Sequence, residues 1–272
     1  MTKQELIKNI LSGERAISSS ALKTGKTSTK EFLDYYLGEK KESKAFDFGN
    51  AFELFLIDEV GFYSKVAVMD ESQRPEPSKD YKTKVNQEWK AEFYAKNADK
   101  YIIAATGKES FETIKELRNL AQEHPMYDAL INGDYQLAFT WNCPVTGLKR
   151  YSRPDVVHKD LGVIIDIKTD ASDDFQRSAL NNDYFLQALD QIQGAIANGI
   201  DVKEYYWAVF EKSGTLHCTF YKLSLDDLLP VETVQEVTLR RIKSDLESGE
   251  NIVWRDMPIK NIKVPTYYAK GY

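Results

Sequence analysis

The amino-acid sequence predicts an α/β fold in which a mixed central sheet is flanked by helices and preceded by a helical N-terminal region. Residues 1–132 have mainly helical periodicity, whereas residues 133–250 alternate between strand-like and helical patterns. The chain has 272 residues, of which 42% are hydrophobic, so it can bury a sizeable core. No break in composition divides it. We therefore expect a single domain over residues 1–272, with a C-terminal tail at 251–272.

Apolar residues at helical spacing predict six helices before the sheet. These are expected at residues 3–11, 30–37, 46–57, 79–98, 108–121 and 124–131. Between the first two, Ser18-Ser19-Ser20 and the run Gly25 to Thr29 indicate a mobile loop. Gly25-Lys26-Thr27 lacks the upstream glycine and the apolar strand of a phosphate-binding loop, so we do not expect an ATPase.

The second half predicts short strands, one helix among them and a long helix at the end. Alternating residues at 135–141 and 149–157 predict a hairpin around the turn at 143–147. The next elements are expected to be strand 163–169, helix 183–199 and strands 204–211 and 216–222. A helix from Leu225 to about Leu246 would close the domain, ending at Ser248-Gly249-Glu250.

Seven lysines between Ser78 and Lys108 are interleaved with aromatic residues. The formal net charge of −6 argues against a nucleic-acid partner, but the local distribution of charge matters more than its sum. The segment could be a DNA-facing helix with aromatic contacts. The alternative, which the sequence slightly favours, is a solvated amphipathic helix whose aromatic residues face the core.

Two charged tripeptides lie in the predicted strands. Arg153-Pro154-Asp155 is followed after ten residues by Asp166-Ile167-Lys168, which ends an apolar run. Because alternate residues of a strand share a face, Asp166 and Lys168 point away from the core that their isoleucine neighbours enter. A turn near residues 159–162 returns Asp155 to the side of Asp166. Two adjacent carboxylates repel each other unless a divalent cation binds between them, as in Mg²⁺ sites that cut phosphodiesters.

The spacing of Pro154-Asp155 and Asp166-x-Lys168 resembles the motif of the PD-(D/E)XK nuclease superfamily. Further along, the expected helix carries Tyr184, Gln187, Ala188 and Gln191 on one face. A similar helix follows the motif in nucleases of the RecB and phage-recombination type. Residues 17–23 and 48–56 resemble N-terminal segments of the RecE-like exonucleases, of the exodeoxyribonuclease VIII type. The resemblance covers roughly residues 15–222 and implies a restriction-endonuclease-like core.

The resemblance also implies the site residues. Asp155, Asp166 and the carbonyl of Ile167 would hold one or two Mg²⁺ or Mn²⁺ ions. Lys168 would orient the attacking water and offset charge in the transition state. Gln187 and Tyr184 would position that water, the lysine or a phosphate.

Glu53 stands where the RecE-like family has a metal-binding histidine four residues after a glycine, here Gly49. A carboxylate is a harder ligand than imidazole and suits Mg²⁺ or Mn²⁺ at least as well, so we expect Glu53 to bind the metal. The alternative is that Glu53 lies on the polar edge of an amphipathic helix.

By the same resemblance, the protein would degrade double-stranded DNA ends from the 5′ terminus. The remaining 3′ single strand would pass to a partner annealing protein in phage-type recombination. A closed ring of identical subunits is expected, with the N-terminal helices and the segment from Ile259 to Tyr268 as candidate contact surfaces. Two alternatives stay open: an endonuclease of the same fold, and a catalytically inactive module that binds DNA ends.

Composition excludes several other classes. Cys143 and Cys218 are too few for a disulfide framework or for a four-cysteine iron–sulfur cluster. The N-terminus lacks the apolar segment of a signal peptide, and no apolar run reaches the length of a membrane span. We therefore expect a cytoplasmic protein with no membrane partner.

Overall fold

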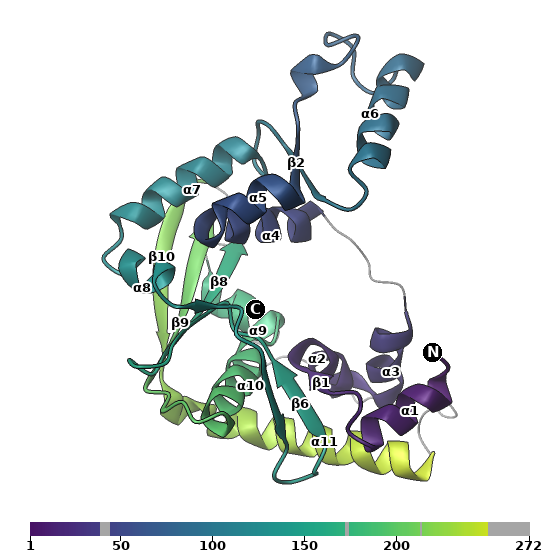
Figure 1. Ribbon diagram of the computed structural model, residues 1–272, viewed down its shortest axis with the longest axis vertical. Helices are drawn as coiled ribbons and strands as arrows, with labels where there is room; N and C mark the ends of the chain where they lie inside the picture. The colour runs from purple at the N-terminus through teal and green to yellow at the C-terminus, as the bar shows by residue number, and fades with distance from the viewer. Residues whose placement is uncertain (39–43, 172–173, 213, 250–272) are drawn as a thin grey trace, which may run out of the picture.

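The computed structural model describes residues 1–38, 44–171, 174–212 and 214–249 (Figure 1). Its strands are β1 (Ile17–Ser18), β2 (Val66–Met69), β3 (Tyr101–Ala104), β4 (Asp134–Tyr135), β5 (Phe139–Asn142), β6 (Lys149–Ser152), β7 (Val156–His158), β8 (Val163–Asp170), β9 (Glu204–Glu211) and β10 (His217–Leu223). The α-helices are α1 (Lys3–Leu11), α2 (Ser19–Thr27), α3 (Thr29–Leu37), α4 (Lys44–Ile57), α5 (Glu59–Lys65), α6 (Lys84–Lys96), α7 (Phe111–Glu123), α8 (Tyr127–Ile131), α9 (Phe175–Asn181), α10 (Tyr184–Ala197) and α11 (Leu229–Ser248). Short 3₁₀ helices lie at Glu71–Gln73 and Leu225–Leu228. The fold is of the predicted mixed α/β class.

The central sheet has five strands in the order β10-β9-β8-β7-β4. Strands β8 and β9 are parallel, and the other pairs are antiparallel. A parallel pair needs a crossover connection, which α9 and α10 provide. Strand β8 is buried on both faces, because Ile164 packs into one core cluster and Ile165 into another. This explains its near-continuous apolar sequence.

Helices cover both faces of the central sheet (Figure 1). On one face, α4 and α7 contribute apolar side chains to a core that includes Ile165 and Phe210. On the other face, α9 and α10 pack against a core that includes Ile164 and Trp207. The end of β8 therefore lies between α4 and α10, where side chains from both helices can reach it.

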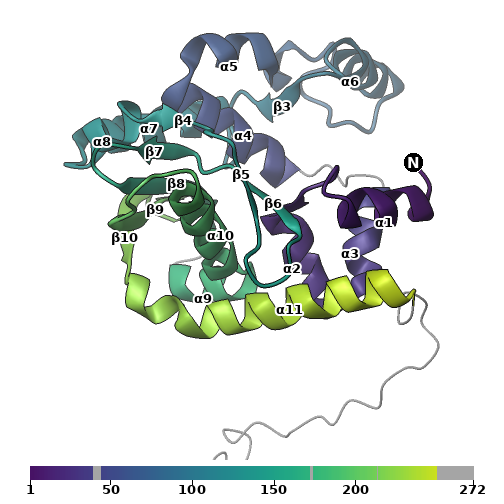
Figure 2. The same cartoon turned by 60° about the horizontal axis from the view of Figure 1, so that its bottom comes forward.

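A third core joins the N-terminal helices to the rest of the molecule. It contains apolar residues of α1, α2, α3 and α11, together with Leu186 of α10. Figure 2 shows α11 running along the base of the molecule, from the sheet to the N-terminal helices. As predicted, this long helix ends at Gly249, whose φ of +70° is the left-handed conformation that glycine adopts readily.

The hairpin predicted at 135–141 and 149–157 is wrong in its strand bounds, because each strand is broken in two. Gln136 has a φ of +48°, which ends β4 and sends the chain to β5 in a different sheet. In the returning segment, Pro154 has no amide hydrogen for a strand ladder, and the chain changes from β6 to β7 across residues 153–155. Strands β5 and β6 instead form a small sheet with β1.

The expected mobile loop after residue 18 is also wrong, since residues 19–27 form α2. The side chain of Ser18 caps this helix by accepting a hydrogen bond from the amide of Ala21. Gly25 lies within the helix, and a Cβ there would come within 2.7 Å of the side chain of Ile242 on α11. Both signals that suggested a loop therefore have another cause, which is capping in one case and close packing in the other.

The lysine-rich segment forms an arm that leaves the body between β2 and β3 (Figures 1 and 2). These two strands pair in parallel, and α6 lies in the connection between them. Asn86 is the one residue of α6 that is buried, so the aromatic residues of this helix do not face a core. Trp89 and Phe93 are half-buried but belong to none of the three core clusters, which argues against the second interpretation, and contact with DNA stays a prediction.

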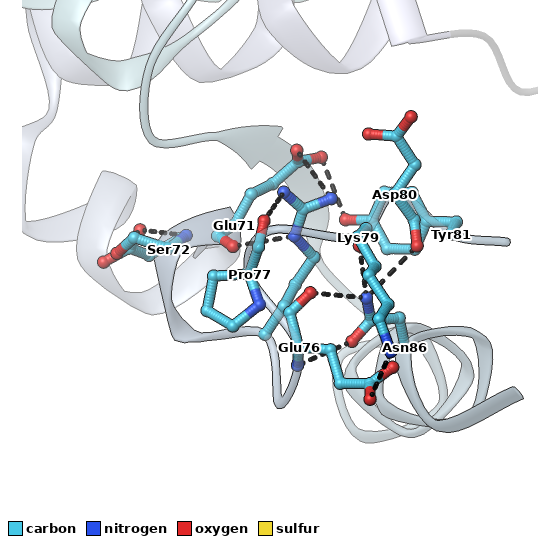
Figure 3. Close-up of polar contacts among 10 residues, drawn as sticks. Glu71, Ser72, Glu76, Pro77, Lys79, Asp80, Tyr81 and Asn86 are labelled. Atoms are coloured by element: carbon cyan, nitrogen blue, oxygen red, sulfur yellow. Dashed lines mark hydrogen bonds and ion pairs between the residues drawn. The ribbon is translucent and has the colours of Figure 1, made fainter. Parts of the chain in front are cut away.

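Asn86 holds the arm together. Its amide donates to the carbonyls of Glu76, Lys79 and Asp80 at 2.5 to 3.1 Å, and its oxygen accepts from the amide of Glu76 (Figure 3). One buried side chain thus satisfies four backbone groups that precede α6, which compensates for the absence of an apolar core. In the described part of the chain, no helix is both long and apolar enough to cross a membrane.

Candidate active site

The hairpin of β7 and β8 brings the two charged tripeptides together. Val156 pairs with Ile165, so Asp155 lies beside Asp166 at the end of the ladder. The backbone amide of Ile167 donates to Asp155 Oδ2 at 2.7 Å. The turn is closed by a hydrogen bond from the amide of Gly162 to the carbonyl of His158, and Gly162 has a φ of +67°. The expected return of Asp155 to Asp166 is confirmed.

Asp166 is completely buried and has partners on both oxygens. Its Oδ1 accepts hydrogen bonds from Gln187 Nε2 at 3.0 Å and from Gln191 Nε2 at 2.9 Å. Its Oδ2 forms an ion pair with Lys168. Because Gln187 and Gln191 are one helical turn apart on α10, both amides face the same carboxylate. These contacts fix the orientation of the Asp166 carboxylate.

Each glutamine is oriented by a donor on its other end. Tyr205 donates its hydroxyl hydrogen to Gln191 Oε1 at 2.7 Å, and Lys23 Nζ donates to Gln187 Oε1 at 3.2 Å. An amide whose oxygen is held in this way must present its NH₂ group to Asp166. Tyr205 comes from β9 and Lys23 from α2, so two further elements fix the site.

A pocket of about 270 Å³ opens beside this cluster. It is lined by Phe46, Gly49, Asn50, Glu53, Asp155, Ile167, Lys168, Thr169 and Tyr184. Glu53 and Asp155 therefore face one space from α4 and from the hairpin. Asp166 lies behind this wall, and Lys168 links it to the pocket. Of the residues that the sequence predicts for the site, Glu53, Asp155, Ile167, Lys168 and Tyr184 line the pocket, whereas Asp166 and Gln187 lie next to it and contact each other.

The carboxylates affect one another electrostatically. Burial, together with the charges of Asp166 and Glu53, raises the pKa of Asp155 well above its usual value. Burial and the charge of Asp166 also raise the pKa of Glu53, although a hydrogen bond from Gln136 opposes the change. Burial alone would lower the pKa of Lys168, but the charges of Asp166 and Asp155 outweigh it and raise this pKa. Lys168 thus neutralises part of the negative charge that the carboxylates share.

The donor chemistry of the pocket fits a divalent cation. Glu53, Asp155 and the Ile167 carbonyl are oxygen donors, which hard cations prefer, and the mutual repulsion of the carboxylates would be relieved by a positive ion. In the described residues, however, no three His, Cys, Asp or Glu side chains converge closely enough to enclose a metal. Asp166 Oδ2 is paired instead with the ammonium of Lys168.

Sequence reasoning missed three contributors to the site. Tyr205 and Lys23 orient the glutamines, and Gln136 donates to Glu53. None of the three belongs to the local motif, since each reaches the site from a distant segment. Gln191 was placed on the correct helix face by its spacing, but its contact with Asp166 could not be deduced without the position of β8.

A second polar cluster lies behind α10. Arg150 Nη2 donates to both carboxylate oxygens of Asp190 at 2.6 Å, and the two side chains are 1% and 0% exposed. Gln235 of α11 donates to Asp190 at 2.7 Å, and Arg150 Nε donates to the carbonyl of Ile17 at 3.3 Å. This cluster connects β1, β6 and α11 to the helix that carries Gln187 and Gln191.

Comparison with protein families matches residues 18–200 to a family described as a PDDEXK-like domain of unknown function (DUF3799). Comparison with curated proteins gives no match. Among solved structures, the chain is similar to a protein from Eubacterium rectale described as a candidate exonuclease. The TM-score is 0.60 at 15% identity, over 93% of this chain and 92% of that one, which shows a shared fold. A structure described as SSO0001 aligns over 85% of each chain at 14% identity, but its TM-score of 0.30 is too low to support an argument.

Proposed function

Because the chain belongs to the family of PDDEXK-like domains, we propose that it is a metal-dependent nuclease that degrades linear double-stranded DNA from its ends. The observation that carries this proposal is that Glu53, Asp155 and Lys168 line one pocket, with Asp166 paired to Lys168 directly behind it. Two carboxylates and a lysine at the end of a β-hairpin supply what phosphodiester hydrolysis requires, namely a cation site and a group that orients the nucleophile.

Glu53, Asp155, Asp166 and the Ile167 carbonyl would hold the cation, which we propose to be Mg²⁺ or Mn²⁺. A bound divalent ion would polarise the scissile phosphate and stabilise the leaving oxygen. Gln187 and Gln191 fix the position of Asp166 through its Oδ1, so α10 would hold this carboxylate in place for the ion.

Lys168 would act once the cation replaces it as the partner of Asp166. Its ammonium borders the pocket and its raised pKa keeps it protonated, so it can orient a water molecule and offset charge on the phosphate. The ring of Tyr184 lies 4.9 Å from Lys168 Nζ and restricts where the ammonium can move. Gln187 would keep Asp166 in place through its hydrogen bond to Oδ1.

The preference for DNA ends, the 5′→3′ direction and a recombination role rest on the RecE-like segments at 17–23 and 48–56. Both segments contribute to the site, since the first carries Lys23 and the second carries Gly49 and Glu53. In this proposal the product is a 3′ single strand that an annealing protein receives.

The test is digestion of a linear duplex labelled at either the 5′ or the 3′ end, with Mg²⁺, with Mn²⁺ or with EDTA. We expect metal-dependent loss of the duplex, with early release of the 5′ label. The variant Asp155→Asn should lose at least about 100-fold in rate. Asp160→Asn, which changes an exposed carboxylate in the turn of the same hairpin, should keep the wild-type rate.

Each alternative gives a different result in this assay. Full activity in EDTA would contradict the metal mechanism. Cleavage of a nicked circle as fast as of the linear duplex would indicate an endonuclease of the same fold. Binding of DNA ends without cleavage, and without a calorimetric signal for metal binding, would indicate an inactive end-binding module.

A further inference from the structure

Lys23 reaches the site from α2, a helix that belongs to the N-terminal region. Its ammonium lies 3.2 Å from Gln187 Oε1 and 5.2 Å from the centre of the Tyr184 ring. Lys168 lies 4.9 Å from the centre of the same ring. Two ammonium groups therefore share one aromatic ring at the edge of the catalytic pocket, and one of them has no part in the motif.

The charge of Lys23 has no direct counter-ion in the described residues. The ammonium groups of two nearby lysines do have counter-ions, since Lys168 pairs with Asp166 and Lys26 pairs with Asp183. Lys23 instead donates to a neutral amide, which leaves two of its three hydrogens for another acceptor. Burial and repulsion by Lys168 lower the pKa of Lys23 to about 8, so the side chain is still mostly charged at neutral pH. A half-buried ammonium without an anion costs free energy that a bound anion would recover.

We propose that Lys23 binds a backbone phosphate of the nucleic acid strand, next to the phosphate that is cut. This inference rests on the proposed function and adds a binding residue to it. Lys168 lies next to Asp155 and Asp166, where the phosphate would be cut. Lys23 lies on the other side of Gln187, away from these carboxylates. A phosphate is the fitting ligand because its oxygens accept from the free hydrogens of the ammonium. Lys23 is thus a substrate-binding residue that places the strand across the pocket.

The experiment measures binding of a short fluorescein-labelled duplex by anisotropy, in EDTA, over a series of KCl concentrations. Wild type is compared with Lys23→Gln, Lys23→Met and Lys23→Arg. Loss of one phosphate contact should weaken binding about 5- to 20-fold and reduce the slope of log K against log salt by about one. The arginine variant should keep most of the affinity because it keeps the charge.

Lys26→Gln is the matched control, because it removes an ammonium one turn along the same helix that is already paired with Asp183. It should leave the salt slope unchanged, and an equal loss in this variant would overturn the specific role of Lys23. Thermal unfolding gives the second readout. The glutamine and methionine variants should melt at or above the wild-type temperature, because they remove an uncompensated charge, and a clear fall would indicate a structural role instead.

The two proposals fail in different ways. If wild type digests DNA in Mg²⁺ and Lys23→Gln has the wild-type affinity and salt slope, the assignment of Lys23 is wrong and the nuclease proposal stands. If wild type neither binds nor digests DNA, both proposals are wrong.

Discussion

The carboxylate of Asp155 is the group in the pocket whose charge is least favourable in the metal-free protein. Its pKa is raised by burial and by Asp166 and Glu53, so the folded protein binds this proton more tightly than the unfolded chain does. The associated stability is complete at low pH and is lost as the pH rises through the raised pKa. A cation bound beside the ionised carboxylate would offset this cost, so metal binding would be coupled to proton release.

Asp155→Asn should therefore raise stability while it abolishes activity. At neutral pH in EDTA, we expect the variant to unfold with a free energy about 1 kcal/mol above that of wild type, and the two should converge on acidification toward pH 4 or below. Urea unfolding across this pH range measures the difference, and Asp160→Asn is the control. If the free energy of unfolding depends on pH in the same way for wild type and Asp155→Asn, then ionisation of Asp155 does not destabilise the folded protein.

Glu53 is the residue at which this chain departs from the RecE-like pattern. If it binds the cation, Glu53→Ala should weaken metal affinity by about 10-fold or more in calorimetry. Glu53→His should restore activity better with Mn²⁺ than with Mg²⁺, because imidazole suits the softer ion. Glu59→Ala, which removes a surface ion pair with Arg118, should change neither property. Unchanged metal affinity in Glu53→Ala would leave this residue as part of the helix surface.

A site residue could be predicted from the sequence only where its contacts are with residues close to it along the chain. Asp155, Asp166 and Lys168 follow from strand alternation and one tight turn, whereas helical spacing places Gln187 and Gln191 on one face of a helix without showing what that face contacts. Lys23 and Tyr205 could not be found in this way, because their contacts depend on where α2 and β9 pack. The sequence identifies the residues of the local motif but not those that reach the site from distant elements.

At the scale of secondary structure, α10 is the element on which the site depends. It carries Gln187 and Gln191 toward Asp166, and on its other side Asp190 is held by Arg150 and Gln235. The sequence predicted this helix and the apolar β8, since both have strong periodicity. It did not predict α2 or the breaks in the hairpin strands, because a serine cap, a close-packed glycine and one left-handed glutamine are weak local signals that tertiary packing decides.

The buried pair that holds α10 gives a prediction at this scale. Arg150→Met leaves Asp190 charged and without its main partner, so the free energy of unfolding should fall by about 3 to 5 kcal/mol. The double variant Arg150→Met, Asp190→Leu should recover most of the loss, because no buried charge remains. Chemical denaturation measures both. Lys159→Met, which breaks an exposed pair with Asp134, should change stability by less than about 0.5 kcal/mol. Failure of the double variant to recover stability would show that the guanidinium acts through packing.

On the scale of the whole molecule, the body consists of a nuclease-type sheet and an N-terminal helical group joined by α10 and α11. The sequence predicted both parts and the long final helix, but it did not predict that α2 would join the site. The candidate contact segment at Ile259 to Tyr268 lies outside the described residues. The ring of identical subunits therefore stays a proposal for which the N-terminal helices offer a surface.

Light scattering at micromolar concentration tests this proposal. A closed ring should have a mass that is a whole multiple, three or more, of the 31.2 kDa of one chain. Addition of short duplex DNA should either leave the number of subunits unchanged or promote assembly of the full ring. A mass of one chain, with and without DNA, would exclude the ring, and processive digestion would then need a different explanation.

The arm between β2 and β3 has a consequence for how the molecule fluctuates. A helix that connects two parallel strands normally packs on their sheet, but α6 buries Asn86 alone, and a helix of 13 residues is marginal in water without such support. The arm should therefore open as a separate unit at a lower free energy than the body. Amide hydrogens of α6 should exchange with solvent long before those of α10. Loss of the Asn86 amide should remove most of the protection from exchange in the arm, while the central sheet keeps its protection.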